Sequence, residues 1–265
     1  MGPPSLAREA VGVTPGGLRE RLMSGHAALG TMVFELNSVG LPRILDAAGA
    51  DFVLIDLEHT GWSVDAVHPM LAAARASTVE PIARVQGSAR HLISPVLDAG
   101  ARGVMVPMVG GAEEAAAVVR AARFAPAGDR GFGLLYPDQL VDGVGAAIER
   151  AEAQTIVIVQ IETLAGVEHV EEISETPGVD VLWIGQFDLS VAMGIPGAFD
   201  DPRMREAEDR MLTACSRAGV AAGVLVGSVD VARSMLERGF RMIALGTDID
   251  LYGSALGAGL AALRR

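Results

Sequence analysis

The stretch that decides the fold is DFVLIDLEHTGWSVDAVHPMLAAARA, residues 51–76. Residues 51–56 are an apolar run of the kind found in strands buried on both faces. Gly61 then marks a turn, and residues 63–76 have the apolar spacing of a helix. Between strand and helix lie Asp56, Glu58 and His59. Why two carboxylates and an imidazole should follow a buried strand is the first question that the sequence raises.

The same strand and helix unit recurs along the 265 residues. Strand-like runs are expected at residues 28–34, 51–56, 80–85, 102–107, 155–162, 179–185, 220–226 and 240–246. Helices are expected at residues 63–76, 88–100, 111–124, 165–176, 201–219 and 228–239. Continuous apolar strands that alternate with helices indicate parallel pairing and burial on both faces. Eight such units favour a (β/α)8 TIM barrel over an open, doubly wound sheet.

The domain organisation follows from composition, which does not change along the chain. We expect one barrel domain over residues 18–265, preceded by a flexible segment at residues 1–17. Residues 125–143, rich in Gly and Pro, form the longest break in the alternation and predict a loop on the active-site face or a partner-contact segment. Residues 251–263 are uncharged and largely apolar. We expect this C-terminal helix to pack on a neighbouring subunit.

Composition excludes several classes of function. The net charge of −12 argues against nucleic acid and anionic membranes as partners. All 21 basic residues are arginine, which excludes a lysine Schiff base, a pyridoxal phosphate anchor and a Walker-type phosphate loop. No apolar run is long enough to span a membrane, and the first residues lack the apolar core of a secretion signal. The single Cys215 cannot form an internal disulfide, so we expect a cytoplasmic protein.

Polar residues lie where the expected strands end, which is the catalytic end of such a barrel. They are His59, Arg84, Gln160, Glu162 and Asp188. Each also has a simple structural interpretation. Asp188 can cap a helix, Glu162 can complement a helix dipole, Arg84 can form an ion pair, and His59 can be a satisfied polar residue. Their convergence on one mouth favours a functional site.

These residue types indicate a particular chemistry. Glu162 and Asp188, on adjacent strand ends, suit a hard divalent cation such as Mg²⁺ or Mn²⁺, whereas no Cys or His cluster suggests zinc. Arg84 adds a positive charge that does not titrate, and His59 adds a proton acceptor near neutral pH. Such a set can stabilise an enolate and move one proton.

The ordered motifs IDLEH, ARV, LDAGARGVMVPMV, RGFG, VQIET, GVEHVEEI, GVDVLWIGQFDLS and GTDIDLY resemble the HpcH/HpaI aldolase family over residues 18–256. These are class II, metal-dependent pyruvate aldolases, including aldolases of 2,4-dihydroxyhept-2-ene-1,7-dioate and of 2-keto-3-deoxy sugar acids. The resemblance implies a barrel of the phosphoenolpyruvate/pyruvate-binding type and a homo-oligomer, expected as a hexamer. It also implies pyruvate and an aldehyde as small-molecule partners, with Mg²⁺, Mn²⁺ or Co²⁺ as the metal.

The resemblance further implies a role for each site residue. Glu162 and Asp188 bind the metal, His59 is the catalytic base, Asp98 orients His59, and Arg84 steadies the enolate. Backbone amides hold the pyruvate carboxylate, and the glutamine of the QIE motif lies near the substrate; these substrate-binding residues are Gln160, Gly185, Gln186, Phe187 and Asp188.

The chain departs from the common family pattern at three positions. Leu57 stands where glycine is commoner, and Gln186 and Phe187 replace the small residues of a GPSDL motif. We expect Phe187 and Trp62 either to narrow the pocket or to pack beneath a loop. Alternative functions are an oxaloacetate decarboxylase, a macrophomate synthase-like enzyme, an acyl-CoA lyase or a non-catalytic barrel scaffold.

Overall fold

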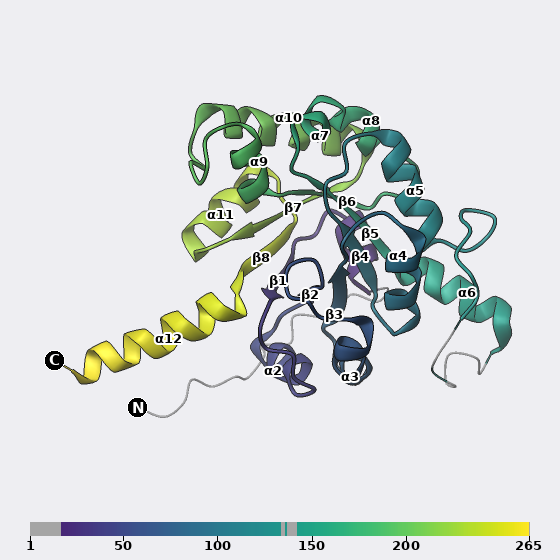
Figure 1. Ribbon diagram of the computed structural model, residues 1–265, viewed down its shortest axis with the longest axis horizontal. Coiled ribbons are helices and arrows are strands. Elements are labelled where there is room, and N and C mark those ends of the chain that lie inside the picture. Colours follow the sequence, from purple (N-terminus) through teal and green to yellow (C-terminus); the bar gives the residue numbers. More distant parts are fainter. Residues whose placement is uncertain (1–16, 134–135, 137–141, 265) are drawn as a thin grey trace.

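The computed structural model describes residues 17–133, 136 and 142–264, in which eight parallel strands form a closed barrel (Figure 1). Each strand pairs with the next, and β1 pairs with β8 to close the barrel. The predicted (β/α)8 barrel is therefore confirmed. The strands are β1 (Ala28–Val33), β2 (Phe52–Asp56), β3 (Glu80–Arg84), β4 (Gly103–Val106), β5 (Ile156–Ile161), β6 (Val181–Ile184), β7 (Ala221–Val226) and β8 (Met242–Thr247).

Strands β2, β4, β5 and β6 are buried on both faces along their whole length, as their continuous apolar sequences predicted, whereas β1 exposes Leu29. One apolar core fills the barrel and includes Phe52, Ile82 and Trp183, while a larger one lies between the strands and the surrounding helices. The observed strands are shorter than predicted by one to three residues. Glu162 and Gly185 therefore lie just beyond the ends of β5 and β6, where side chains leave the barrel wall.

The helices surround the barrel (Figure 1). Seven of them cover the six predicted helical segments, because the segment at 165–176 is two short helices that meet at His169, whose φ of −105° and ψ of 18° interrupt the helix. The sequence reasoning missed α1, α2, α6 and α9. The helices are α1 (Gly17–Met23), α2 (Leu41–Ala48), α3 (Val64–Ala74), α4 (Arg90–Asp98), α5 (Ala112–Ala122), α6 (Gly143–Gln154), α7 (Leu164–Glu168), α8 (Val170–Ser174), α9 (Gln186–Ala192), α10 (Pro202–Ala218), α11 (Val229–Arg238) and α12 (Asp248–Leu263).

The described residues of the segment at 125–143 contact the C-terminal ends of α4 and α5, where the Asp129 N–H donates to the Arg120 carbonyl at 2.9 Å. Arg130 pairs with Asp98 at 2.7 Å, and the Tyr136 hydroxyl donates to the Ala99 carbonyl at 2.9 Å. None of these described residues lines the cavity described below. Their position therefore does not support the predicted loop on the active-site face; part of the segment lies outside the described residues.

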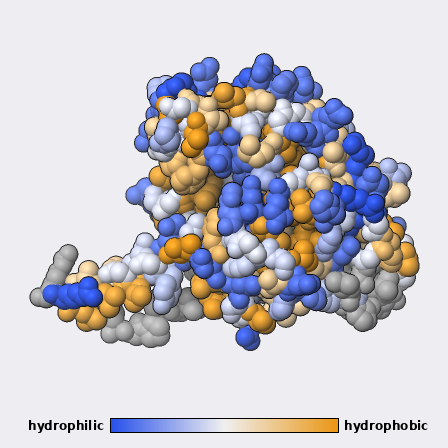
Figure 2. All heavy atoms as spheres, in the orientation of Figure 1, coloured by the Kyte–Doolittle hydropathy of each residue, from blue (hydrophilic) through white to orange (hydrophobic). Residues whose placement is uncertain are grey.

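Helix α12 projects away from the barrel (Figure 1). Its first residue, Asp248, is buried and accepts backbone N–H bonds from Phe34, Glu35 and Leu36, which fixes where the helix leaves the barrel. Every residue from 249 to 264 is exposed, and Figure 2 shows apolar side chains along this projecting helix. Neither α12 nor any other helix in the described part of the chain is long and apolar enough to cross a membrane.

Candidate active site

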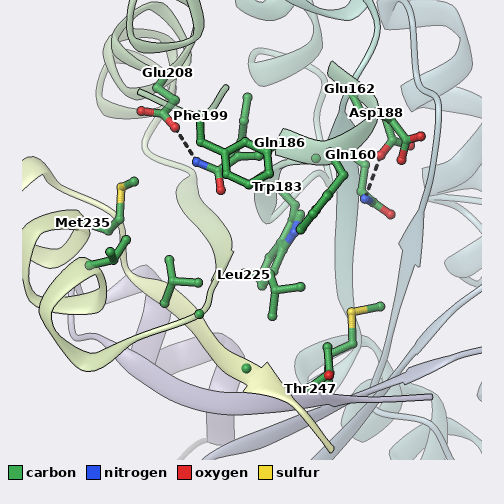
Figure 3. A pocket seen from close by; sticks show the side chains of 18 of the residues that line it. Gln160, Glu162, Trp183, Gln186, Asp188, Phe199, Glu208, Leu225, Met235 and Thr247 are labelled. Atoms are coloured by element: carbon green, nitrogen blue, oxygen red, sulfur yellow. Dashed lines mark hydrogen bonds between the residues drawn. The ribbon is translucent and has the colours of Figure 1, made fainter. Parts of the chain in front are cut away.

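A cavity of about 610 Å³ opens at the carboxyl ends of the strands (Figure 3). Its walls carry most of the residues singled out from the sequence. Eight of the nine predicted site residues line it: His59, Arg84, Gln160, Glu162, Gly185, Gln186, Phe187 and Asp188. Asp98 does not.

The floor of the cavity is apolar and includes Met105, Trp183 and Leu225. The Trp183 ring has room inside the barrel because its neighbour on β7 is Gly223. A Cβ at Gly223 would lie 2.3 Å from Cε3 of Trp183, a distance that real carbon atoms do not adopt. The glycine thus allows the indole to form a fixed, water-excluding base for the site.

Asp56 explains the cluster of acidic residues after β2. Its side chain is fully buried and accepts backbone N–H bonds from Glu58 and His59, both at 3.1 Å. Arg84 Nε donates to Asp56 Oδ1 at 2.7 Å from the neighbouring strand β3. Asp56 therefore positions the other two residues and anchors Arg84, and it does not itself line the cavity.

Glu58 connects the arginine and the histidine. Its Oε2 lies 3.3 Å from Arg84 Nε and 3.6 Å from His59 Nε2. Burial raises the pKa of Glu58, and the positive charge of Arg84 opposes that rise. The His59 side chain is 55% exposed and lines the cavity, where solvent and substrate can reach it.

Glu162 is held from two sides. Its Oε1 accepts the Met108 backbone N–H at 2.7 Å, and its Oε2 accepts Gln160 Nε2 at 3.0 Å. Met108 has a φ of 59°, an uncommon conformation for a non-glycine residue, and this points its N–H at the carboxylate. The other end of the amide, Gln160 Oε1, is buried, and no described residue donates to it. It is therefore available to a donor that enters the cavity.

Asp188 lies in the first turn of α9, beside Glu162 (Figure 3). The Glu162 carboxylate can occupy this position only because residue 185 is glycine. A Cβ at Gly185 would lie 2.3 Å from Glu162 Oε2. The Gly185 N–H is already used, since it donates to the Ile161 carbonyl at 3.1 Å. The N–H groups of Gln186, Phe187 and Asp188 begin the helix and have no partner within it.

The pKa of Glu162 is raised to about 7. Burial is the largest cause, and the negative charges of Asp188 and Glu58 add to it, whereas the hydrogen bond from the Met108 N–H and the charge of Arg84 oppose it. A cation between Glu162 and Asp188 would remove this repulsion, and carboxylate oxygens are the donors that hard divalent cations prefer. The pair therefore fits such an ion. Within the described residues no group of three or more His, Cys, Asp or Glu side chains could hold a metal, so substrate and water would complete the coordination.

The residues that differ from the common family pattern, together with Trp62, occupy different positions in the structure. Phe187 lines the cavity, is 64% exposed, and contacts Phe199 edge to face with ring centroids 4.9 Å apart, so it narrows the mouth. Trp62 instead packs against the outer apolar core. Leu57 is buried in that same core and points away from the cavity lining.

Asp98 lies apart from the other predicted residues. It is the last residue of α4, which leads into the start of β4, whereas His59 follows the carboxyl end of β2. Its carboxylate pairs with Arg130. The structure does not bring Asp98 and His59 together within one chain.

A comparison with protein families settles the classification. The model of the family described as HpcH/HpaI aldolase/citrate lyase matches residues 31–255. The chain belongs to the HpcH/HpaI family. It is 36% identical over 243 residues to the hydroxypyruvate/pyruvate aldolase of Paraburkholderia phytofirmans, a match that covers 88% of this chain and 91% of the relative.

Two further members of the HpcH/HpaI family show similar agreement. The 4-hydroxy-2-oxo-heptane-1,7-dioate aldolase of Shigella sonnei is 34% identical over 235 residues, covering 88% of this chain and 89% of the relative. The crystal structure of a family protein from Burkholderia cenocepacia has a TM-score of 0.83 at 34% identity, over 93% of this chain and 98% of that one. This chain is thus an enzyme, a carbon–carbon lyase of the HpcH/HpaI family.

Sequence reasoning missed several residues that shape this HpcH/HpaI cavity. Asp56 was noted in the sequence, but its role was missed. Its position before a turn is a signal for a side chain that accepts hydrogen bonds from backbone N–H groups. The role of Met108 had no signal, because a positive φ is not expected of methionine. Glu208 and Arg238, which line a further part of the cavity, were only charged residues within expected helices.

Proposed function

We propose that the protein reversibly cleaves a 4-hydroxy-2-oxo acid into pyruvate and an aldehyde. The observation that carries this proposal is the convergence of His59, Arg84, Glu162 and Asp188 on one cavity in a chain of the aldolase family. The activities named for the relatives from Paraburkholderia and Shigella support it.

Glu162 and Asp188 would hold a divalent cation, Mg²⁺, Mn²⁺ or Co²⁺. When bound, this cation supplies Lewis-acid polarisation of the 2-oxo group. Because only two side chains hold it, its affinity for the protein alone is expected to be modest.

Arg84 provides the permanent positive charge of the site. Asp56 fixes the guanidinium by a 2.7 Å hydrogen bond, and Arg84 is buried apart from the part that faces the cavity. A charge held in place before reaction stabilises negative charge on the substrate oxygen without reorganisation. The N–H groups at the start of α9 would bind the substrate carboxylate, and Gln160 Oε1 would accept a hydrogen bond from substrate or from a bound water.

His59 is the proposed base. It removes the proton from the C4 hydroxyl, directly or through water, while Glu58 beside its Nε2 stabilises the imidazolium that results. The C4 oxygen then forms the aldehyde carbonyl, the C3–C4 bond breaks, and its electron pair forms the enolate of pyruvate. Protonation of that enolate at C3 gives pyruvate. Condensation is the reverse sequence.

The test is a panel of aldehydes incubated with pyruvate, the purified protein and Mg²⁺, Mn²⁺ or Co²⁺. Products are identified by nuclear magnetic resonance, which shows the carbon skeleton formed. We expect 4-hydroxy-2-oxo acids that appear only with a divalent cation. Failure to form a carbon–carbon bond with any aldehyde and any of the three metals would remove the proposal.

An acyl-CoA lyase is the less favoured alternative. Its substrate carries phosphates that normally bind unpaired basic side chains. The arginines lining the cavity lie next to carboxylates: Arg84 by Asp56, Arg205 by Asp200 at 3.7 Å, and Arg238 by Glu208. No free basic cluster is therefore present among the described lining residues.

The proposal includes assembly into a homo-oligomer, expected as a hexamer, in the cytoplasm. The exposed apolar residues of α12 are more than a solvated helix ordinarily carries; those at least 41% exposed are Ile249, Leu251, Tyr252, Leu256, Leu260 and Leu263. Packing of α12 on a neighbouring copy would cover them. The role implied for Asp98 also requires assembly, because only Asp98 of another copy would have access to His59.

A further inference from the structure

The cavity extends beyond the part that pyruvate would occupy. Figure 3 shows Glu208 and Met235 across Trp183 from Glu162 and Asp188. This side lobe, as we call it, lies between α9, α10 and α11. It is lined by Gln186, Phe199, Glu208, Val231, Met235 and Arg238. The reacting carbonyl group lies near Glu162 and Asp188, and the side lobe is a part of the same cavity into which the aldehyde component can extend from there.

A buried carboxylate organises the side lobe. Glu208 is only 2% exposed, forms an ion pair with Arg238, and accepts a hydrogen bond from Gln186 Nε2 at 2.6 Å. An ionised carboxylate can only accept hydrogen bonds, so the nitrogen of the Gln186 amide must face Glu208. This fixes the orientation of an amide that would otherwise be free to turn over.

The Gln186 oxygen consequently points the other way. Figure 3 shows Gln186 Oε1 directed away from Glu208 into the cavity. No described residue donates a hydrogen bond to it. Gln186 as a whole is 9% exposed and Glu208 holds its amide in place. A ligand that displaces water from Gln186 Oε1 must therefore bring a hydroxyl or N–H donor, because an acceptor left unpaired costs free energy.

The charges around the side lobe disfavour a carboxylate ligand. The donors of Arg238 are directed at Glu208 and Asp209, and Arg205 lies near Asp200. Of the residues that line the side lobe, Glu208 is acidic and Arg238 is basic, and the two pair with each other. An anionic tail would therefore find no free cationic partner in the side lobe, whereas an uncharged hydroxyl group needs none.

We propose that the side lobe binds an uncharged hydroxyaldehyde, with Gln186 Oε1 accepting a hydrogen bond from the hydroxyl next to the aldehyde carbon. Gln186 is thereby a specificity-determining residue, and Glu208 is the residue that positions it. The assignment rests on the proposed aldolase function and names the class of its second substrate.

The test compares aldehydes of matched shape in the condensation with saturating pyruvate and Mn²⁺. Glycolaldehyde and propanal differ by a hydroxyl in place of a methyl group, and succinic semialdehyde carries a carboxylate. One hydrogen bond of ordinary strength predicts that kcat/KM for glycolaldehyde exceeds that for propanal by about 10-fold. Succinic semialdehyde should be the poorest of the three.

Three variants test the residues. Gln186→Met keeps the side-chain length, removes the acceptor, and should lower the glycolaldehyde to propanal ratio by about 10-fold. Glu208→Gln no longer fixes the amide and should lower the same ratio by a smaller factor. Asp209→Asn removes the other carboxylate that Arg238 contacts, outside the lobe, and should leave the ratio unchanged. The glycolaldehyde to propanal ratio does not depend on the fraction of enzyme that is folded. A melting curve measures the folding of each variant separately.

Three results would overturn the inference: wild type that does not prefer glycolaldehyde, a Gln186→Met variant that retains the preference, or a preference for succinic semialdehyde. A different failure identifies the proposed function as the error. If wild type condenses none of the aldehydes and does not exchange the methyl protons of pyruvate, the aldolase proposal falls, and this inference falls with it.

Discussion

Replacing Glu162 by glutamine should make the metal-free protein more stable at alkaline pH. The Glu162 carboxyl group is 3% exposed, and burial raises its pKa to about 7 from an ordinary value of 4.5. That difference corresponds to about 3 kcal/mol between the two protonation states. Glutamine keeps the shape and the bond from the Met108 N–H, and Gln160 can turn its unpaired Oε1 toward the new amide.

The sign follows from proton binding in each state. Below pH 4.5 the carboxyl group is protonated in both the folded and the unfolded chain. Between pH 4.5 and about 7 the unfolded chain loses the proton and the folded chain keeps it, so stability falls as pH rises. Above about pH 7 both states are deprotonated, and the free energy of unfolding falls no further. The glutamine variant should therefore gain about 3 kcal/mol relative to wild type between pH 4.5 and pH 8.5.

The assay is urea unfolding of EDTA-treated protein at several pH values. Glu237→Gln, the same change at an exposed site on α11 outside the cavity, is the control and should show no such gain. Addition of Mn²⁺ at pH 8.5 should restore stability to wild type and not to Glu162→Gln, because a bound ligand stabilises only the chain that binds it. The reasoning would be refuted if the free energies of unfolding of Glu162→Gln and wild type differed by the same amount at every pH.

Three other changes probe the site and the assembly. His59→Ala should lower aldol activity by about 10²- to 10⁴-fold and retain most metal-dependent oxaloacetate decarboxylation, since carbon dioxide leaves without a proton being removed; equal loss of both activities, with the fold intact, would contradict the proposed role. Asp56→Ala should cost about 3–5 kcal/mol in urea unfolding, because buried Arg84 loses its 2.7 Å hydrogen bond to Asp56 and keeps only Glu58 at 3.3 Å, and a cost below 1 kcal/mol would show that the pair does not anchor the site. Joint replacement of Leu256 and Leu260 by glutamate should shift the sedimentation of the protein to a smaller species, whereas a wild-type protein that already sediments as a monomer at micromolar concentration would contradict packing of α12 on a neighbouring subunit.

The sequence was sufficient to predict the barrel and the mouth of its cavity. Both depend on local patterns: apolar strands, helices between them, and polar residues at strand ends. Glu162 and Asp188 could be placed near each other because the carboxyl ends of parallel strands lie at one end of a barrel. Strand positions were right to within a few residues, since pattern alone does not show where the ladder of hydrogen bonds ends.

Other features depend on contacts between distant parts of the chain. Glu208 and Arg238 lie on different helices, and nothing in either helical pattern shows that they meet beside Gln186. Helix α9 was missed because it is short and its sequence continues directly from β6. Asp98 could not be placed relative to His59, because a motif gives the order of residues and not the distance between them.

The claim that the cavity forms the enolate of pyruvate is tested most directly by hydrogen exchange in the absence of any aldehyde. Pyruvate in D₂O is incubated with the protein, and loss of its methyl proton signal is followed by nuclear magnetic resonance. We predict exchange that requires Mg²⁺, Mn²⁺ or Co²⁺, stops when EDTA is added, and resumes when the metal is restored. It should also be lost in Glu162→Gln and Arg84→Ala. Undiminished exchange after exhaustive EDTA treatment, or no exchange with any of the three metals, would contradict the account.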